Sequence, residues 1–179
     1  METFYFKPDV SKVSDWAISC HEKTNHYYDK YLPYSFHLRM VEKNVQDFIS
    51  DIPEEDRATV LSAAWCHDLI EDARVSYMDI LSISSKEIAE ISRAVTNYGR
   101  GRTREERMPD SVYHDIANTK YATFVKLADR LANVQYGKMT GSSMLKKYKK
   151  EHVHFKKMIY VTGQYEKMWS AIEQIFNES

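Results

Sequence analysis

Residues 66–72 of this chain are Cys66-His67-Asp68-Leu69-Ile70-Glu71-Asp72, and they end the most apolar helix that the sequence predicts, over residues 54–71. A helix that is apolar on nearly every side usually lies at the centre of a fold. Carboxylates at the end of such a helix are costly unless they are neutralised, and one divalent cation neutralises several. The pairs His67–Glu71 and Asp68–Asp72 should each share a helix face. The stretch predicts a cation site, and the alternative is a surface cluster beyond the helix end.

A second candidate ligand is Asp129, which stands alone in an otherwise apolar stretch of sequence. Asn133 follows it by one helical turn and should lie on the same face. The alternative role for Asp129 is a salt bridge to Lys126 or Arg130, which flank it in the sequence.

His37 is the third candidate, because it begins another predicted helix over residues 35–50. Taken alone, a histidine in this place is more often a helix cap or a partly exposed surface residue than a ligand. Taken with the others, it completes a ligand set from three helices: His37, His67, Asp68 and Asp129. Imidazoles mixed with carboxylates suit Mn²⁺, Fe²⁺ or Zn²⁺ better than they suit a structural zinc held by thiolates.

The composition is that of a soluble globular protein. Of 179 residues, 43% are hydrophobic and 28% charged, which excludes disorder as the main state. Lys plus Arg number 25 and Asp plus Glu 26, and this balance argues against nucleic acid or an anionic membrane as a partner. The chain has 5 glycines and 4 prolines, too few turn-forming residues for a β-sandwich or a doubly wound sheet. An all-α fold is therefore expected.

The chain shows no sign of export. Cys20 and Cys66 form no CxxC pair and are expected to be reduced thiols, which is typical of a cytoplasmic protein. No apolar run approaches the ~20 residues of a membrane span. Residues 1–9 lack the apolar segment of a secretory signal.

The hydrophobic periodicity predicts a single domain over residues 1–179, with its motifs within about 13–160 and a last helix reaching 177. Two loops interrupt the helices, a basic one over 97–109 and a second one over 137–141. The predicted helices cover residues 11–30, 35–50, 54–71, 78–81, 85–97, 112–135, 145–161 and 163–176.

Three strings together resemble a known family. They are Pro33-Tyr34-x-x-His37, His67-Asp-Leu-Ile-Glu-Asp72 and Lys126-Leu-Ala-Asp-Arg-Leu-Ala-Asn133. The order His, His-Asp, Asp is that of the HD-domain metal-dependent phosphohydrolases. The longer strings look like the motifs of guanosine 3′,5′-bispyrophosphate (ppGpp) hydrolase domains, both those of the RelA/SpoT enzymes and the small stand-alone hydrolases of the metazoan Mesh1 type.

The resemblance implies an HD-domain helical bundle and a metal-dependent 3′-pyrophosphohydrolase. Its substrate would be a small nucleotide, with ppGpp as the leading candidate. It implies one divalent ion, Mn²⁺ before Fe²⁺ or Zn²⁺, held by the four residues His37, His67, Asp68 and Asp129. Glu71 and Asp72 would orient and activate the attacking water, and Asn133 would contact the ribose of the substrate.

The chain departs from the family where the base should bind. An Arg-Lys pair and a glycine precede the first motif in the bifunctional enzymes, whereas this chain has Tyr28-Asp29-Lys30-Tyr31. We expect Tyr28 and Lys30 to line the nucleotide site, with Tyr28 stacking on the base. Arg102, in the basic loop, is expected to reach the distal phosphates.

Two alternatives remain open at the level of sequence. One is an HD-type nucleoside monophosphate phosphatase, and the other is a nucleotide-sensing module without catalysis. The sequence does not decide between a monomer and a homo-oligomer.

Overall fold

The computed structural model describes residues 8–99, 106 and 108–179, and it confirms the all-α prediction. Within this part of the chain the α-helices are α1 (Val10–Lys23), α2 (Ser35–Asp47), α3 (Arg57–Cys66), α4 (Leu69–Asp72), α5 (Tyr77–Ile83), α6 (Lys86–Val95), α8 (Asp110–Asn118), α9 (Ala122–Thr140), α10 (Ser143–Ile159) and α11 (Glu166–Asn177). Short 3₁₀ turns, η1 (Ile49–Asp51) and η2 (Glu54–Asp56), connect α2 to α3. No described helix is long and apolar enough to cross a lipid bilayer.

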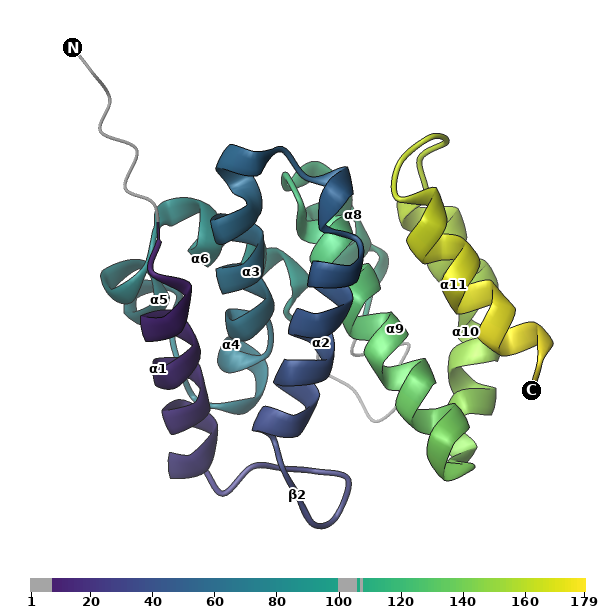
Figure 1. Cartoon of the computed structure of the whole chain (residues 1–179), viewed down its shortest axis with the longest axis horizontal. Helices are drawn as coiled ribbons and strands as arrows, with labels where there is room; N and C mark the ends of the chain where they lie inside the picture. Colours follow the sequence, from purple (N-terminus) through teal and green to yellow (C-terminus); the bar gives the residue numbers. More distant parts are fainter. Residues whose placement is uncertain (1–7, 100–105, 107) are drawn as a thin grey trace.

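Helix α3 lies at the centre of the bundle, as its apolar sequence predicts. It packs against α1, α2, α6 and α9, and Figure 1 shows it between α1 and α2. Seven of its ten residues are buried. Helix α9 crosses beside α2 and separates it from α10 and α11 (Figure 1). The elements that carry the candidate ligands are therefore direct neighbours in the core.

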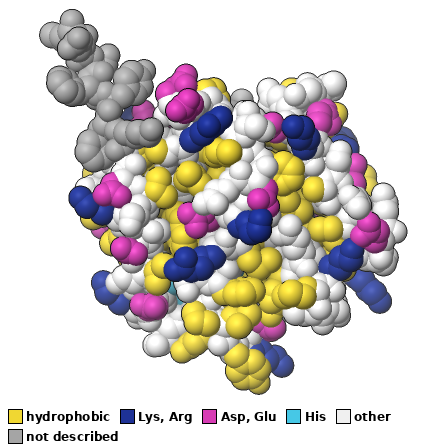
Figure 2. All heavy atoms as spheres, viewed as in Figure 1, with side chains coloured by type: hydrophobic (Ala, Val, Ile, Leu, Met, Phe, Trp, Pro, Cys, Tyr) yellow, Lys and Arg dark blue, Asp and Glu magenta, His cyan; other side chains and the backbone are white. Residues whose placement is uncertain are grey.

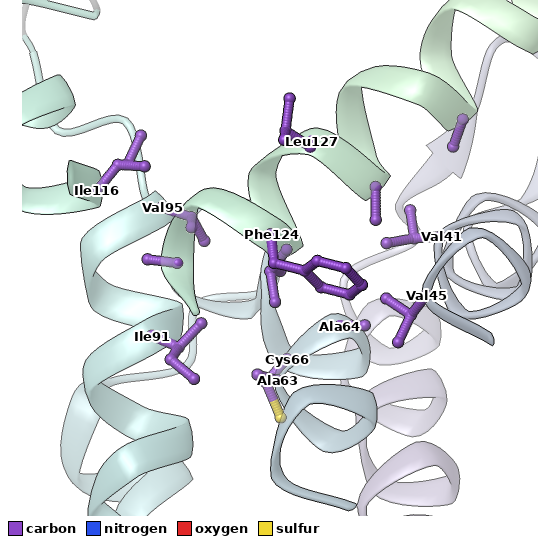
Figure 3. Packing of buried hydrophobic residues seen from close by; sticks show 14 of the residues in the cluster. Val41, Val45, Ala63, Ala64, Cys66, Ile91, Val95, Ile116, Phe124 and Leu127 are labelled. Atoms are coloured by element: carbon purple, nitrogen blue, oxygen red, sulfur yellow. The ribbon is translucent and has the colours of Figure 1, made fainter. Parts of the chain in front are cut away.

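The packing around Phe124 shows how tightly these helices meet. Its ring is fully buried, and it lies among Val41 and Val45 of α2, Ala64 of α3 and Val95 of α6 (Figure 3). Interiors packed in this way resist small shifts of their helices. The backbone that carries the candidate site is therefore held firmly.

The first predicted helix, over residues 11–30, is too long and the prediction is wrong at its end. Helix α1 stops at Lys23, where the Thr24 hydroxyl donates a hydrogen bond to the carbonyl of His21 and Asn25 takes a left-handed conformation with φ of 50°. Asparagine is one of the few residues that ends a helix in this way. The chain then forms a short antiparallel hairpin, β1 (Tyr27–Tyr28) and β2 (Leu32–Pro33).

The hairpin presents aromatic side chains to the outside. Tyr27 is 54% exposed and Tyr31 is 85% exposed. Figure 2 shows hydrophobic side chains gathered along the lower edge of the molecule, where the hairpin lies in Figure 1.

Three further boundaries differ from the prediction. The helix expected over 112–135 is two helices, α8 and α9, separated at residues 119–121, where Tyr121 takes a left-handed conformation with φ of 65°. The helix expected over 54–71 is interrupted at His67 and Asp68, between α3 and α4. The loop expected over 137–141 is mostly helix, because α9 continues to Thr140 and ends at Gly141, which has φ of 66°. Gly137 lies inside α9, where a Cβ would meet the Cβ of Leu145 at 3.3 Å, so the glycine permits close approach of α10 rather than a turn.

Candidate metal centre

The four predicted ligands come together from three places in the core. His37 lies in the first turn of α2, His67 and Asp68 lie at the break between α3 and α4, and Asp129 lies in the middle of α9. Both histidines are 1% exposed and Asp129 is 9% exposed. Far-apart segments of sequence thus place titratable side chains at one buried point.

The distances among these side chains suit one shared cation. His37 Nε2 lies 3.3 Å from Asp129 Oδ1 and 3.7 Å from Asp68 Oδ2. His67 Nε2 lies 2.8 Å from Asp68 Oδ2 and 3.8 Å from Asp129 Oδ1. Ligand atoms about 2.1 Å from one ion are separated from one another by roughly 3–4 Å. Donor atoms of His37, His67 and Asp129 also lie within 4.8 Å of one another as a group.

The helix break explains how two consecutive residues reach the same point. On a regular helix His67 and Asp68 would point about 100° apart. Here Asp68 leaves the helical conformation, with φ of −104° and ψ of 2°, and its carboxylate turns toward the His67 ring. The predicted alignment of Asp68 with Asp72 holds for the backbone, because Asp72 N donates to Asp68 O at 2.9 Å.

The contacts of its two nitrogens fix the orientation of the His67 ring. Its Nδ1 lies 2.7 Å from the carbonyl of Ala64, which can only accept, so this nitrogen carries a proton. The opposite nitrogen, Nε2, is buried and lies 2.8 Å from Asp68 Oδ2. Metal-binding histidines are usually oriented by a contact at the other nitrogen, like that of Nδ1 with Ala64. Nε2, which lies beside two carboxylates, is the nitrogen that would face a bound metal ion.

The carboxylates stay charged in spite of their burial. Burial opposes ionisation of Asp68, but the His67 imidazole holds the pKa of Asp68 well below its usual range. Burial acts likewise on Asp129, whose pKa is held low by Lys126 and then by the two histidines. Burial opposes protonation of His67, yet Asp68 and Asp129 raise the pKa of His67 to about 9. The site therefore attracts positive charge.

One predicted alternative for Asp129 is also present. Lys126 is buried and its Nζ lies 3.2 Å from Asp129 Oδ2, the oxygen other than the one facing the histidines. Arg130 instead approaches Glu151, with 3.4 Å between the charged atoms. Asp129 thus contacts Lys126 through Oδ2 and faces the candidate metal position with Oδ1.

The two carboxylates that follow Asp68 have different surroundings. Glu71 accepts hydrogen bonds from the backbone and the side-chain amide of Asn97, at 3.0 and 3.1 Å. Asp72 has its pKa raised to about 7, first by burial and then by the charges of Asp68 and Glu71. Asn97 is a partner that the sequence did not suggest, because it lies far along the chain after α6.

The residues predicted to bind substrate divide into three groups. Tyr28 and Asn133 lie at the metal centre, where the Tyr28 hydroxyl donates to Asn133 at 3.1 Å. The Tyr28 ring stacks on His37, with 4.8 Å between ring centroids. Lys30 lies exposed at the turn of the hairpin. Arg102 falls outside the described residues.

A hollow of about 220 Å³ opens next to these residues. Tyr28 and Asn133 form its wall toward the metal centre, and the Tyr136 hydroxyl closes one side by donating to Asp29 at 2.9 Å. Its lining is Tyr28, Asp29, Asn133, Tyr136, Gly137, Ser142, Met144 and Tyr148. The wall is aromatic with a few polar groups, which is usual for small-molecule sites.

Tyr34 is a site residue that the sequence analysis did not single out. Its hydroxyl donates to Asp68 Oδ2. Burial and the Asp68 charge raise the pKa of Tyr34 well above its ordinary value, so the hydroxyl keeps its proton. Tyr34 was visible only as part of the Pro33-Tyr34-x-x-His37 string.

No protein-family model matches the chain, and no curated protein matches it. Among solved structures, one described as that of a metazoan ortholog of SpoT that hydrolyzes ppGpp and plays a role in starvation responses is similar to it. The TM-score is 0.69 at 20% identity, and the match covers 94% of each chain. At this identity the match establishes the fold. The chain has the all-helical HD fold of that hydrolase, as the three sequence strings predicted.

Proposed function

We propose that this protein is a metal-dependent nucleotide phosphohydrolase, and that its reaction is removal of the 3′-pyrophosphate of ppGpp. The observation that carries the proposal is the convergence of two histidines and two aspartates on one point of the core, inside a fold shared with a ppGpp hydrolase. Carboxylates in a core are costly unless they are neutralised, and one divalent ion would neutralise both of them.

His37, His67, Asp68 and Asp129 would hold the ion. This nitrogen and oxygen set suits Mn²⁺, Fe²⁺ or Zn²⁺, and the family resemblance puts Mn²⁺ first. When bound, such an ion polarises a phosphoryl oxygen and lowers the pKa of a coordinated water. Lys126 balances part of the negative charge of the site through the second oxygen of Asp129.

Asp72 is the proton acceptor in this proposal. A base works best when its pKa lies near the working pH, and the pKa of Asp72 is raised to about 7. Glu71 is held by Asn97 and so has a fixed position from which to orient the attacking water. The sequence expectation gave these roles to the two residues jointly, and the division between them belongs to this proposal.

The nucleoside would occupy the hollow beside Tyr28 and Asn133. Its aromatic lining suits stacking with a base. Lys30 stays a predicted part of the nucleotide site, and Arg102 stays a predicted contact of the distal phosphates, since guanidinium groups are usual partners of phosphate.

The test is to incubate the full chain and Mn²⁺ with ppGpp, with its adenine counterpart, and with GMP and AMP, and to identify the released phosphate. We expect pyrophosphate from the 3′-pyrophosphates. The matched control is the same reaction with Asp72→Asn, where release should fall. Orthophosphate from the monophosphates, with both 3′-pyrophosphates intact, would favour a nucleoside monophosphate phosphatase. Binding without any product would favour a sensing module.

A further inference from the structure

Two tyrosines of the segment between α1 and α2 reach the two carboxylates of the metal centre. Tyr28 lies in β1, and Tyr34 directly follows β2 at the start of α2. The hairpin register pairs Tyr28 with Leu32, which turns the chain back on itself between the two tyrosines. One short element therefore supplies both hydroxyl groups.

Tyr34 acts on Asp68 directly. Its ring stacks on His21 and His26, which also contact each other, with centroid separations of 4.3 and 4.0 Å, and Tyr34 is 8% exposed. This stack fixes the direction of the hydroxyl, which donates to Asp68 Oδ2. That oxygen is the one 2.8 Å from His67 Nε2.

Tyr28 acts on Asp129 through an amide. Asn133 Nδ2 donates to Asp129 Oδ1 at 2.6 Å, and Asn133 Oδ1 accepts from the Tyr28 hydroxyl at 3.1 Å. An ionised carboxylate can only accept, so the amide nitrogen must face Asp129 and the amide oxygen must face Tyr28. Asp129 Oδ1 is the oxygen 3.3 Å from His37 Nε2.

We propose that Tyr34 and Tyr28 are positioning residues that aim the two carboxylates at the metal, Tyr34 directly and Tyr28 through Asn133. A carboxylate oxygen offers two lone pairs, so a hydrogen bond to one leaves the other directed between the histidines. The Tyr28 ring adds a second restraint, because it stacks on His37. This inference rests on the proposed metal site but not on the identity of the nucleotide.

The experiment compares Tyr34→Phe and Tyr28→Phe, each of which removes a hydroxyl and keeps the packed ring. Tyr31→Phe is the matched control, because Tyr31 belongs to the same hairpin and is 85% exposed. The probe is Co²⁺ added to the full metal-free chain, followed by its visible absorption bands and by calorimetry. We expect about 10–100-fold weaker Co²⁺ binding and altered bands in both variants, the usual cost of losing such a support. Tyr31→Phe should match wild type.

A second comparison separates the two routes. In an Asn133→Ala background Tyr28→Phe should have no further effect on Co²⁺ affinity, since its link to Asp129 is already cut. Tyr34→Phe should keep its full effect there, because contacts that share no partner add independently. Thermal unfolding without metal checks that each variant is folded.

Wild-type affinity and wild-type bands in both folded Phe variants would overturn the proposal. If Tyr28→Phe had its full effect without Asn133, the relay through the amide would be wrong. Failure of wild-type protein to bind Co²⁺ would instead remove the metal site itself, and with it both the proposed function and this inference.

Discussion

Asp72 and Glu71 are neighbours with different constraints, and the difference decides their expected roles. Glu71 is fixed by Asn97, whereas Asp72 is partly buried beside Asp68 and has its pKa raised to about 7. A carboxylate of this kind can both accept and release a proton near neutral pH.

We predict that Asp72→Asn keeps the metal and loses roughly 10²–10⁴-fold in kcat, the usual contribution of a general base. Glu71→Gln should lose less, because it retains part of the contact with Asn97. Steady-state kinetics together with metal analysis of both variants provides the check. Loss of metal in Asp72→Asn would make Asp72 a ligand and refute the assignment.

The pH profile follows from the same residue. Only the ionised carboxylate accepts a proton, so kcat/KM of wild type should fall as the pH drops through the pKa of Asp72. That pKa is raised to about 7 without metal, and a nearby cation favours ionisation of the carboxyl group. The acidic limb of the pH profile should therefore lie at or below pH 7. The limb should be missing from the residual activity of Asp72→Asn. Its persistence in that variant would assign it to another group.

Residue type and spacing predicted which candidate ligands come together, but not the side chains that support them. His67 and Asp68 carry the motif, and Asp129 stands out among apolar neighbours, so their types and positions were informative. Tyr34 and Asn97 were missed because their contacts depend on the path of the hairpin and of the chain after α6. A tyrosine or asparagine in a loop gives no periodic signal.

At the scale of elements, a buried polar contact sets how α2 lies against α9. Asn44 of α2 is 2% exposed, and its Nδ2 lies 3.1 Å from both the carbonyl of Ala128 and Oε1 of Gln135. Ala128 directly precedes Asp129. The contact therefore fixes the relative position of the helices that carry His37 and Asp129.

We predict that Asn44→Ala lowers the free energy of unfolding by about 1–3 kcal/mol, since it removes both hydrogen bonds of this buried side chain. Urea unfolding of the metal-free chain, at constant m value, measures the change. The control is Lys43→Ala on the same helix, whose side chain is 72% exposed and pairs with Asp47 at the surface. It should cost no more than about 0.5 kcal/mol. Equal effects of the two substitutions would contradict this account of the α2–α9 contact.

The type of most secondary-structure elements was predictable from the sequence, but several helix ends were not. Apolar periodicity identified α2, α6, α10 and α11 to within a few residues. The break at His67 and Asp68 has no glycine or proline to mark it. Gly137 suggested a turn, but it serves the contact between α9 and Leu145. In both cases packing and side-chain electrostatics outweigh the local signal.

At the scale of the whole molecule, the fold followed from sparse turn residues and three motif strings. The match to the hydrolase structure bears this out. Base selectivity could not be predicted, because Tyr28 and Asp29 depart from the family pattern. In the structure Tyr28 packs on His37, so its stacking on a base stays a prediction.

Metal binding should stabilise the whole chain. A ligand that binds only the folded state, at a concentration of about 100 times its Kd, raises the free energy of unfolding by ~2.7 kcal/mol. For a chain of this size that corresponds to a rise in Tm of about 5–10 °C. Thermal unfolding with and without Mn²⁺ tests this, and a chelator should reverse the shift. An unchanged Tm in saturating Mn²⁺ would contradict the site.

The most direct test of the central claim is the metal content of the chain after loading with Mn²⁺ and desalting. We predict one ion per wild-type chain and none in Asp129→Asn, with circular dichroism showing that the variant keeps its helices. Asp56→Asn is the matched control, because Asp56 pairs with Lys120 and Tyr121 instead, and it should retain one ion. A wild-type chain without metal, or a full ion in Asp129→Asn, would contradict the claim that these four side chains form a metal centre.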